Sequence, residues 1–237
     1  MQREYVRWFS PGLGKDMEIL VFGHSGTPVL VFPSSMGRFY EWEDFKMIDA
    51  LSYQIEQGYN RIFCVDSVDR ESFYNTSVHP SVRLARNSQY ESYIVNEVVP
   101  YIHQKSGTDY IISTGASFGA YHAANFLFKH PWKFSKLLAL GGAFDIKSFM
   151  NGYYDTSVYF HNPVDYLYHL HDHQVLERLR HMDLRFVTGD YDICKEPNVR
   201  IHHLLNDKAV PNQLDVWGDG TGHDWPWWRN MIQKHIQ

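Results

Sequence analysis

The 237-residue sequence has few cysteines, no long hydrophobic run and no concentration of positive charge. Its two cysteines, Cys64 and Cys194, are too few for a disulfide framework. They allow either a single bridge or two free thiols, and two thiols suit a reducing compartment. No apolar run approaches the roughly 20 residues of a membrane-spanning helix, and the first residues do not resemble a signal peptide. We therefore expect a cytoplasmic protein with no membrane partner.

The charge balance limits the classes of partner further. The formal net charge is −5, and no basic run is long enough to follow a phosphate backbone, so we expect no nucleic acid partner. Charged residues make up 21 % and hydrophobic residues 44 % of the chain, which is typical of a globular protein rather than a disordered one. No repeat or linker divides the sequence. Residues 1–237 are therefore predicted to form a single domain, and nothing in the sequence indicates its oligomeric state.

Short apolar runs alternate with helical patterns along the chain. We predict strands at 5–10, 17–23, 28–34, 61–66, 110–115, 136–142, 184–190 and 213–219. We predict helices at 43–57, 82–104, 118–129, 199–208 and 225–236, with Pro100 kinking or ending the second. This alternation favours an α/β fold with a mostly parallel sheet and helices on both faces. In such sheets, the ligand site lies beyond the carboxyl ends of the strands.

The clearest catalytic motif is Gly-Ala-Ser-Phe-Gly at residues 115–119, between a predicted strand and a predicted helix. In a G-x-S-x-G motif, a sharp strand-to-helix turn holds the central hydroxyl clear of the sheet, and the flanking glycines avoid collisions. The same motif could be a glycine-rich turn whose serine only caps the helix. We interpret Ser117 as a candidate nucleophile. A serine hydroxyl needs a base to take its proton.

The candidate base and acid follow later strands, in the order serine, acid, histidine that hydrolases of this type use. His223 is the only histidine between the last predicted strand and the last predicted helix, although an exposed loop histidine is the alternative. The segment after the 184–190 strand offers two carboxylates, Asp190 and Asp192. We favour Asp192, three residues after the turn residue Gly189, because this is the commoner position of the acid in hydrolases of this type. Asp190 remains the alternative acid, although its side chain could instead hydrogen-bond to the turn itself.

A tetrahedral intermediate needs two backbone N–H groups where its negative oxygen forms. We predict the N–H of Phe118, directly after the nucleophile, as one donor. The other is expected from the loop after the 28–34 strand, with Ser35 favoured and Ser34 or Met36 as the neighbouring choices. The serines of this loop could equally be present only because serine favours turns.

We also predict residues that contact substrate. They are Ser34 and Met36 beside the oxyanion donor, Tyr74 after the 61–66 strand, and Trp225 at the start of the last helix. The aromatic-rich segment 144–182 is a candidate cap over the pocket. Aromatic packing of a surface segment explains the same composition.

Four segments together resemble the esterase D-like branch of the α/β-hydrolase superfamily: GASFG, TGDYD, GTGHDW and PSSMGRFYEWED. The resemblance implies an α/β-hydrolase fold of about eight strands, the second antiparallel, with Ser117, Asp192 and His223 as a catalytic triad. One departure is the loop after the 28–34 strand, where Pro33-Ser34 stands in place of the His-Gly common in relatives. Because that branch includes S-formylglutathione hydrolases, mycolyltransferases and siderophore esterases, the resemblance implies no single substrate.

The combined prediction is a serine esterase that cleaves small-molecule carboxylic esters through an acyl-enzyme. The alternatives are an acyltransferase with the same triad, a peptidase or thioesterase, and a catalytically silent binding protein of the same fold. No cofactor or metal is predicted. The three alternate histidines of His169–His173 would share a face only on a strand, and the later spacing of Leu176 and Leu179 favours a helix instead.

Overall fold

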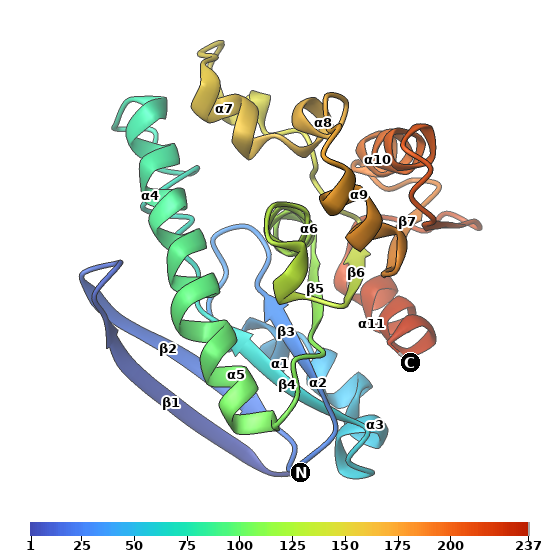
Figure 1. Ribbon diagram of the computed structural model, residues 1–237. Coiled ribbons are helices and arrows are strands. Elements are labelled where there is room, and N and C mark those ends of the chain that lie inside the picture. The colour runs from blue at the N-terminus through green and yellow to red at the C-terminus, as the bar shows by residue number, and fades with distance from the viewer. Residues whose placement is uncertain (237) are drawn as a thin grey trace.

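The structure, a computed structural model, describes residues 1–236 and contains an eight-stranded sheet within them (Figure 1). The strand order is β1-β2-β4-β3-β5-β6-β7-β8. The strands are β1 (Arg3–Ser10), β2 (Lys15–Phe22), β3 (Thr27–Phe32), β4 (Asn60–Val65), β5 (Ile112–Ala116), β6 (Lys136–Leu140), β7 (Asp183–Gly189) and β8 (Gln213–Trp217). Strand β2 pairs antiparallel with β1 and β4, and the remaining neighbours are parallel. The predicted α/β fold with a mostly parallel sheet is confirmed.

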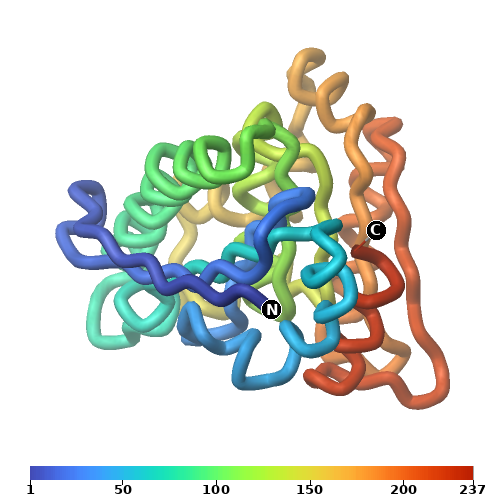
Figure 2. The backbone as a smooth tube through the Cα atoms, turned by 90° about the horizontal axis from the view of Figure 1, so that it is seen from below, coloured from blue at the N-terminus to red at the C-terminus, as the bar shows by residue number. Residues whose placement is uncertain are grey.

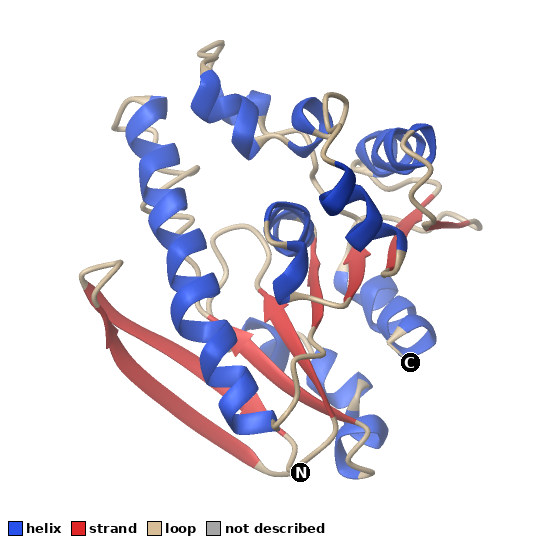
Figure 3. Cartoon of the chain, viewed as in Figure 1, coloured by secondary structure: helices blue, strands red, loops and turns tan. Residues whose placement is uncertain are grey.

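Helices cover both faces of the sheet (Figure 3). They are α1 (Glu41–Asp44), α2 (Met47–Ala50), α3 (Ser52–Glu56), α4 (Pro80–Tyr93), α5 (Val99–Ser106), α6 (Phe118–Lys129), α7 (Thr156–His161), α8 (Pro163–Tyr166), α9 (His173–Arg180), α10 (Lys195–Asp207) and α11 (Trp225–His235). Strand β3 shows why both faces need cover: Leu30 and Phe32 face the core under α4, α5 and α6, while Val29 and Val31 face the core under α1–α3 and α11.

The helices expected at 43–57 and at 82–104 have different outcomes. The single helix expected at 43–57 is wrong, because Lys46 has a left-handed backbone (φ 65°) that separates α1 from α2, and α3 follows as a third short helix. The helix expected at 82–104 is continuous past Pro100. A π-helical turn, η1 (Ile94–Val98), lies directly before Pro100, where a regular helix would have a clash and a missing N–H.

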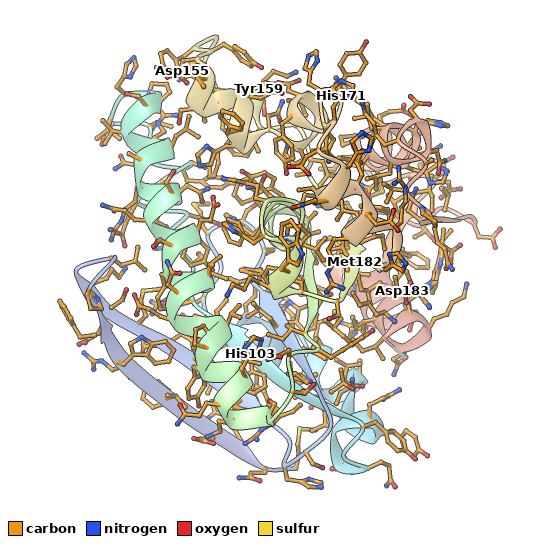
Figure 4. The ribbon with its side chains drawn as sticks, viewed as in Figure 1. His103, Asp155, Tyr159, His171, Met182 and Asp183 are labelled. Atoms are coloured by element: carbon orange, nitrogen blue, oxygen red, sulfur yellow. The ribbon has the colours of Figure 1, made fainter. Side chains whose placement is uncertain are left out.

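The segment between β6 and β7 carries the 3₁₀ turn η3 (Lys147–Met150) and then α7, α8 and α9. Figure 4 shows Asp155, Tyr159 and His171 from this segment at the top of the view, above Met182 and Asp183 at the start of β7 and above His103 in α5. The segment therefore extends beyond the carboxyl end of β6 before α9 leads back to the start of β7.

The helix predicted over His169–His173 begins only at His173, where the Asp172 side chain accepts the N–H groups of Gln174 and Val175. His169 and His171 precede α9, so the three histidines share neither a strand nor a helix. No helix in the described residues has both the length and the apolarity needed to cross a membrane. Figure 2 shows the N-terminal hairpin at one edge of the molecule and the C-terminal elements at the other.

Candidate active site

Ser117 occupies the sharp turn between β5 and α6. Its backbone angles are φ 56° and ψ −119°, a conformation that a residue with a side chain adopts only under strain. The neighbouring chain holds this turn, since the Ser117 N–H donates to the Leu140 carbonyl at 2.8 Å. A Cβ on Gly119 would lie 2.4 Å from the Phe32 carbonyl oxygen, and one on Gly115 would lie 2.4 Å from the backbone of Gly119. Only glycine allows the helix to begin this close to the strands.

The side chains of Ser117, His223 and Asp192 form one hydrogen-bonded chain beyond the ends of β5, β8 and β7. His223 Nε2 lies 2.8 Å from Ser117 Oγ, and His223 Nδ1 lies 2.8 Å from Asp192 Oδ1. The Asp192 side chain is fully buried, whereas 15 % of the His223 side chain is exposed. In this arrangement Nδ1–H donates to the carboxylate, and Nε2 is left to accept the serine proton.

The buried Asp192 carboxyl stays ionised because of its hydrogen bonds. Burial acts to raise its pKa, but the bonds from His223 and from the Cys194 N–H, at 2.7 Å, outweigh burial and lower it. Asp190 is engaged elsewhere: its N–H donates to the Trp217 carbonyl, and its Oδ2 accepts the Gly220 N–H at 3.4 Å. Asp192, rather than Asp190, is therefore the residue that contacts the imidazole.

Among residues 34–37 of the loop after β3, one backbone N–H group makes no hydrogen bond. The Ser34 N–H donates to Glu41 Oε2 at 2.6 Å, the Met36 N–H to Asp69 Oδ2 at 3.1 Å, and the Gly37 N–H to the Ser34 carbonyl at 2.9 Å. Within residues 1–236, the Ser35 N–H has no hydrogen-bond partner. Phe118 is the first residue of α6, so its N–H also lacks a partner in the helix. These are the two donors expected for an oxyanion.

Comparison with known proteins gives the family. A family model described as "Putative esterase" matches residues 10–237. The chain belongs to this esterase family. It is a carboxylic ester hydrolase that acts on small-molecule esters. No curated protein sequence matches the chain.

Solved structures similar to this esterase share its fold at low sequence identity. A ferulic acid esterase is 17 % identical with a TM-score of 0.78, over 98 % of this chain and 95 % of its own. The serine hydrolase FphF of Staphylococcus aureus is 20 % identical with a TM-score of 0.75, over 99 % and 96 %. An S-formylglutathione hydrolase from Agrobacterium tumefaciens is 15 % identical with a TM-score of 0.73, over 99 % and 92 %. The α/β-hydrolase fold and the expected family are thus confirmed.

The four residues predicted to contact substrate have different surroundings in the esterase. Both the N–H and the hydroxyl of Ser34 bond to the Glu41 side chain, so its polar groups are not free for a ligand. Met36 is 40 % exposed. The half-buried Tyr74 lies beside the Ser35 side chain, and burial raises the pKa of its hydroxyl. Trp225 packs edge-on against Trp228 at 5.0 Å. Trp228 in turn meets the His223 ring at 4.9 Å.

Sequence reasoning missed several residues that shape the site. Glu41 stands inside the PSSMGRFYEWED segment, and Asp69 stands four residues after β4. A search for carboxylates near strand ends would have found Asp69, whereas Glu41 begins the short helix α1. His122 lies five residues after Ser117, on α6, where nothing in the sequence marks it as buried against Asp69. Gly141 follows β6 as the first of a glycine pair, which is a sign of close backbone approach.

Both cysteines of the esterase are free, and Cys194 lies next to Asp192 and His223. In the described part of the chain, the only group of three potential metal ligands is Asp192, Cys194 and His223, whose ligand atoms lie within 4.8 Å of one another. Burial, with a smaller contribution from the Asp192 charge, raises the pKa of Cys194 to about 12, so the thiol stays protonated. The Asp192–His223 hydrogen bond already accounts for two of these groups without a metal.

Gly141→Ala is expected to lower kcat by about 10²-fold. Gly141 has φ +54°, and a methyl group there would lie 2.6 Å from Asp192 Oδ2 and 3.2 Å from His223 Nδ1. The clash would displace Asp192 and His223 from Ser117, and a displacement of about 1 Å in a catalytic site can cost a factor of about 10². Steady-state hydrolysis of a p-nitrophenyl ester by the folded variant measures the effect.

Gly107→Ala is the matched control, because Gly107 also has a positive φ (+66°) but nothing within 4 Å of the added Cβ. Both variants carry the left-handed strain, which costs about 1–2 kcal/mol of stability. Only Gly141 lies against the triad. Wild-type kcat in Gly141→Ala would show that its methyl group is accommodated without moving Asp192 or His223.

Proposed function

We propose that this esterase works through a covalent acyl-enzyme formed on Ser117. The Ser117 oxygen attacks the ester carbonyl carbon while its proton moves to His223 Nε2. Asp192 orients His223 and stabilises the imidazolium. The Phe118 and Ser35 N–H groups hold the negative oxygen of the tetrahedral intermediate. When the intermediate collapses, the bond to the alcohol oxygen breaks and that alcohol takes the proton from His223.

The second half of the reaction uses water as the acceptor. His223 takes a proton from the water, whose oxygen attacks the acyl carbonyl, and returns it to Ser117 as the acid product leaves. The observation that carries this proposal is the pair of 2.8 Å hydrogen bonds that join Ser117 to His223 and His223 to Asp192. Because both bonds are formed in the resting arrangement, the base is positioned before substrate arrives.

The substrate pocket that we propose has an aromatic wall next to Ser117. Phe118 meets Phe149 and Tyr74 with ring centroids 5.1 Å and 5.7 Å apart, and Tyr74 and Phe149 are 5.2 Å apart. Phe149 belongs to the segment 144–182, which we propose as the cap of a single domain. Phe118 is fully buried and supports the partly exposed rings of Tyr74 and Phe149, on which an apolar group of the ester would pack. The two free thiols suit the cytoplasm, which we propose as the compartment.

A panel of model substrates tests the reaction class. It contains p-nitrophenyl esters with acyl chains from two to twelve carbons, a short acyl thioester and a p-nitroanilide, each assayed with and without an added alcohol. The proposal expects ester hydrolysis with the acyl group released mainly as free acid. Faster turnover of the thioester or anilide would favour a thioesterase or peptidase. Transfer of most of the acyl group to the alcohol would favour an acyltransferase.

A further inference from the structure

A fully buried pair, Asp69 and His122, contacts the loop that follows β3 and takes no part in the reaction steps above. Asp69 follows β4, and His122 lies in α6. Asp69 Oδ1 is 2.9 Å from His122 Nε2, and both side chains have no exposed surface. The other oxygen, Oδ2, accepts the Met36 N–H at 3.1 Å. One carboxylate thus connects the nucleophile helix to the loop that follows β3.

The hydrogen bonds around His122 assign its proton. His122 Nδ1 is buried and has no partner within the described chain. A lone proton on Nδ1 would be buried without an acceptor, whereas a proton on Nε2 is paired with the Asp69 carboxylate. The Nε2–H group therefore donates to Asp69 and fixes the direction of the carboxylate. The rings of Phe118 and Phe32 pack around the imidazole, at 5.0 Å and 6.1 Å.

The fixed carboxylate in turn determines the backbone of the loop. Met36 has φ 57°, a conformation disfavoured for a side chain that is not glycine, and its N–H is the group that Asp69 holds. On the other side of Ser35, the Ser34 N–H is held by Glu41. Ser35 therefore lies between two peptide N–H groups that carboxylates hold in place, and its own N–H is left free.

We propose that Asp69 and His122 are positioning residues that aim the Ser35 N–H at the oxyanion. The inference rests on the proposed function, since it needs Ser117 chemistry to have an effect. A general gain in stability is a weaker explanation, because taking a charged carboxylate out of water costs much of what its bonds return. The direction of the Ser35 N–H is fixed only if the neighbouring Met36 N–H is bound by an acceptor that does not move. The buried Asp69 carboxylate, held by His122, is such an acceptor.

The experiment compares four test variants and one control variant with the wild-type chain. Asp69→Ala removes the acceptor, while Asp69→Asn keeps an oxygen for the Met36 N–H. His122→Gln keeps a donor close to the Nε2 position, whereas His122→Asn has the same amide on a shorter side chain. Asn125→Ala is the control for general destabilisation, since Asn125 is fully buried on α6 but bonds to Tyr166 rather than to the loop. Each is assayed for kcat and KM with a p-nitrophenyl ester, for the Ki of a trifluoromethyl ketone, and for thermal unfolding.

The trifluoromethyl ketone is the discriminating probe, because its adduct with serine places a negative oxygen in the oxyanion hole. We expect Asp69→Ala to lower kcat by about 10²-fold, as removal of an oxyanion donor does, with KM changed by less than about threefold. The Ki of the ketone should rise in parallel. Asp69→Asn should recover kcat to within about tenfold of wild type, and His122→Gln should be faster than His122→Asn. Asn125→Ala should unfold at lower temperature with wild-type kcat.

Failure of this inference differs from failure of the proposed function. If wild-type protein neither hydrolyses esters nor reacts with a fluorophosphonate, the proposed function is wrong. If the wild type is active and Asp69→Ala keeps kcat and Ki within threefold, the positioning role is wrong. A loss of kcat without weaker ketone binding would also overturn it. If Asp69→Ala does not fold, the His122 pair decides: equal kcat and Ki in His122→Gln and His122→Asn would contradict the inference.

Discussion

Ser117→Ala is expected to lower kcat for a p-nitrophenyl ester by at least about 10⁴-fold, with the fold unchanged. Without the hydroxyl, no acyl-enzyme can form, and only the oxyanion donors and substrate binding remain to assist direct attack by water. The substitution removes no packing from the core, because Ser117 lies in a turn beyond the sheet. Steady-state kinetics on freshly purified protein, with circular dichroism to verify folding, measure the loss.

Ser113→Ala is the control for this experiment. Ser113 lies on β5, four residues before Ser117, is fully buried, and uses its hydroxyl only to bond the Ala123 carbonyl at 3.1 Å. It should retain wild-type kcat and lose about 1 kcal/mol of stability for the lost hydrogen bond. Activity of Ser117→Ala within tenfold of wild type would mean that another group is the nucleophile.

Asp192→Asn is expected to lower kcat by about 10³–10⁴-fold. An amide in place of the carboxylate would donate its N–H to His223 Nδ1, which would place the imidazole proton on Nε2. That nitrogen could then no longer accept the Ser117 proton, and the imidazolium would lose its counter-charge. Because hydrogen bonds lower the pKa of Asp192 despite its burial, the wild-type group is ionised at neutral pH, so the substitution removes a real charge.

Asp190→Asn provides the matched comparison two residues away. Its carboxylate contacts the Gly220 N–H in the turn and not the imidazole. An asparagine oxygen can accept that bond equally well, so kcat should change by less than about threefold. Kinetics of both variants under identical conditions decide between the two acids. A larger loss for Asp190→Asn than for Asp192→Asn would reverse the assignment.

The positions of the site were predictable because of where the strands end. Ser117, Asp192 and His223 each follow an apolar run that reads as a buried strand, and the carboxyl ends of parallel strands meet at one edge of a sheet. The choice between Asp190 and Asp192 depended on the turn after Gly189. Two carboxylates so close in sequence differ only in where that turn directs them, which the local sequence does not determine.

Other features depended on contacts between distant segments. The helix predicted at 43–57 is broken at Lys46, a lysine with positive φ that no local pattern distinguishes. The charged Asp69 and the histidine His122 would be placed on the surface by composition alone. They can be buried because they hydrogen-bond to each other. Asp69 also accepts a backbone N–H from Met36, in a loop that lies far from it in the sequence.

The most direct measurement traps the covalent intermediate. Wild-type protein is mixed with an excess of a p-nitrophenyl ester, quenched in acid within the first turnover, digested and mapped by mass spectrometry. Our account predicts one acyl group per chain, carried by the peptide that contains Ser117, and no such adduct in Ser117→Ala. Rapid ester hydrolysis with the acyl group on a different residue, or with no adduct and no reaction with a fluorophosphonate, would contradict it.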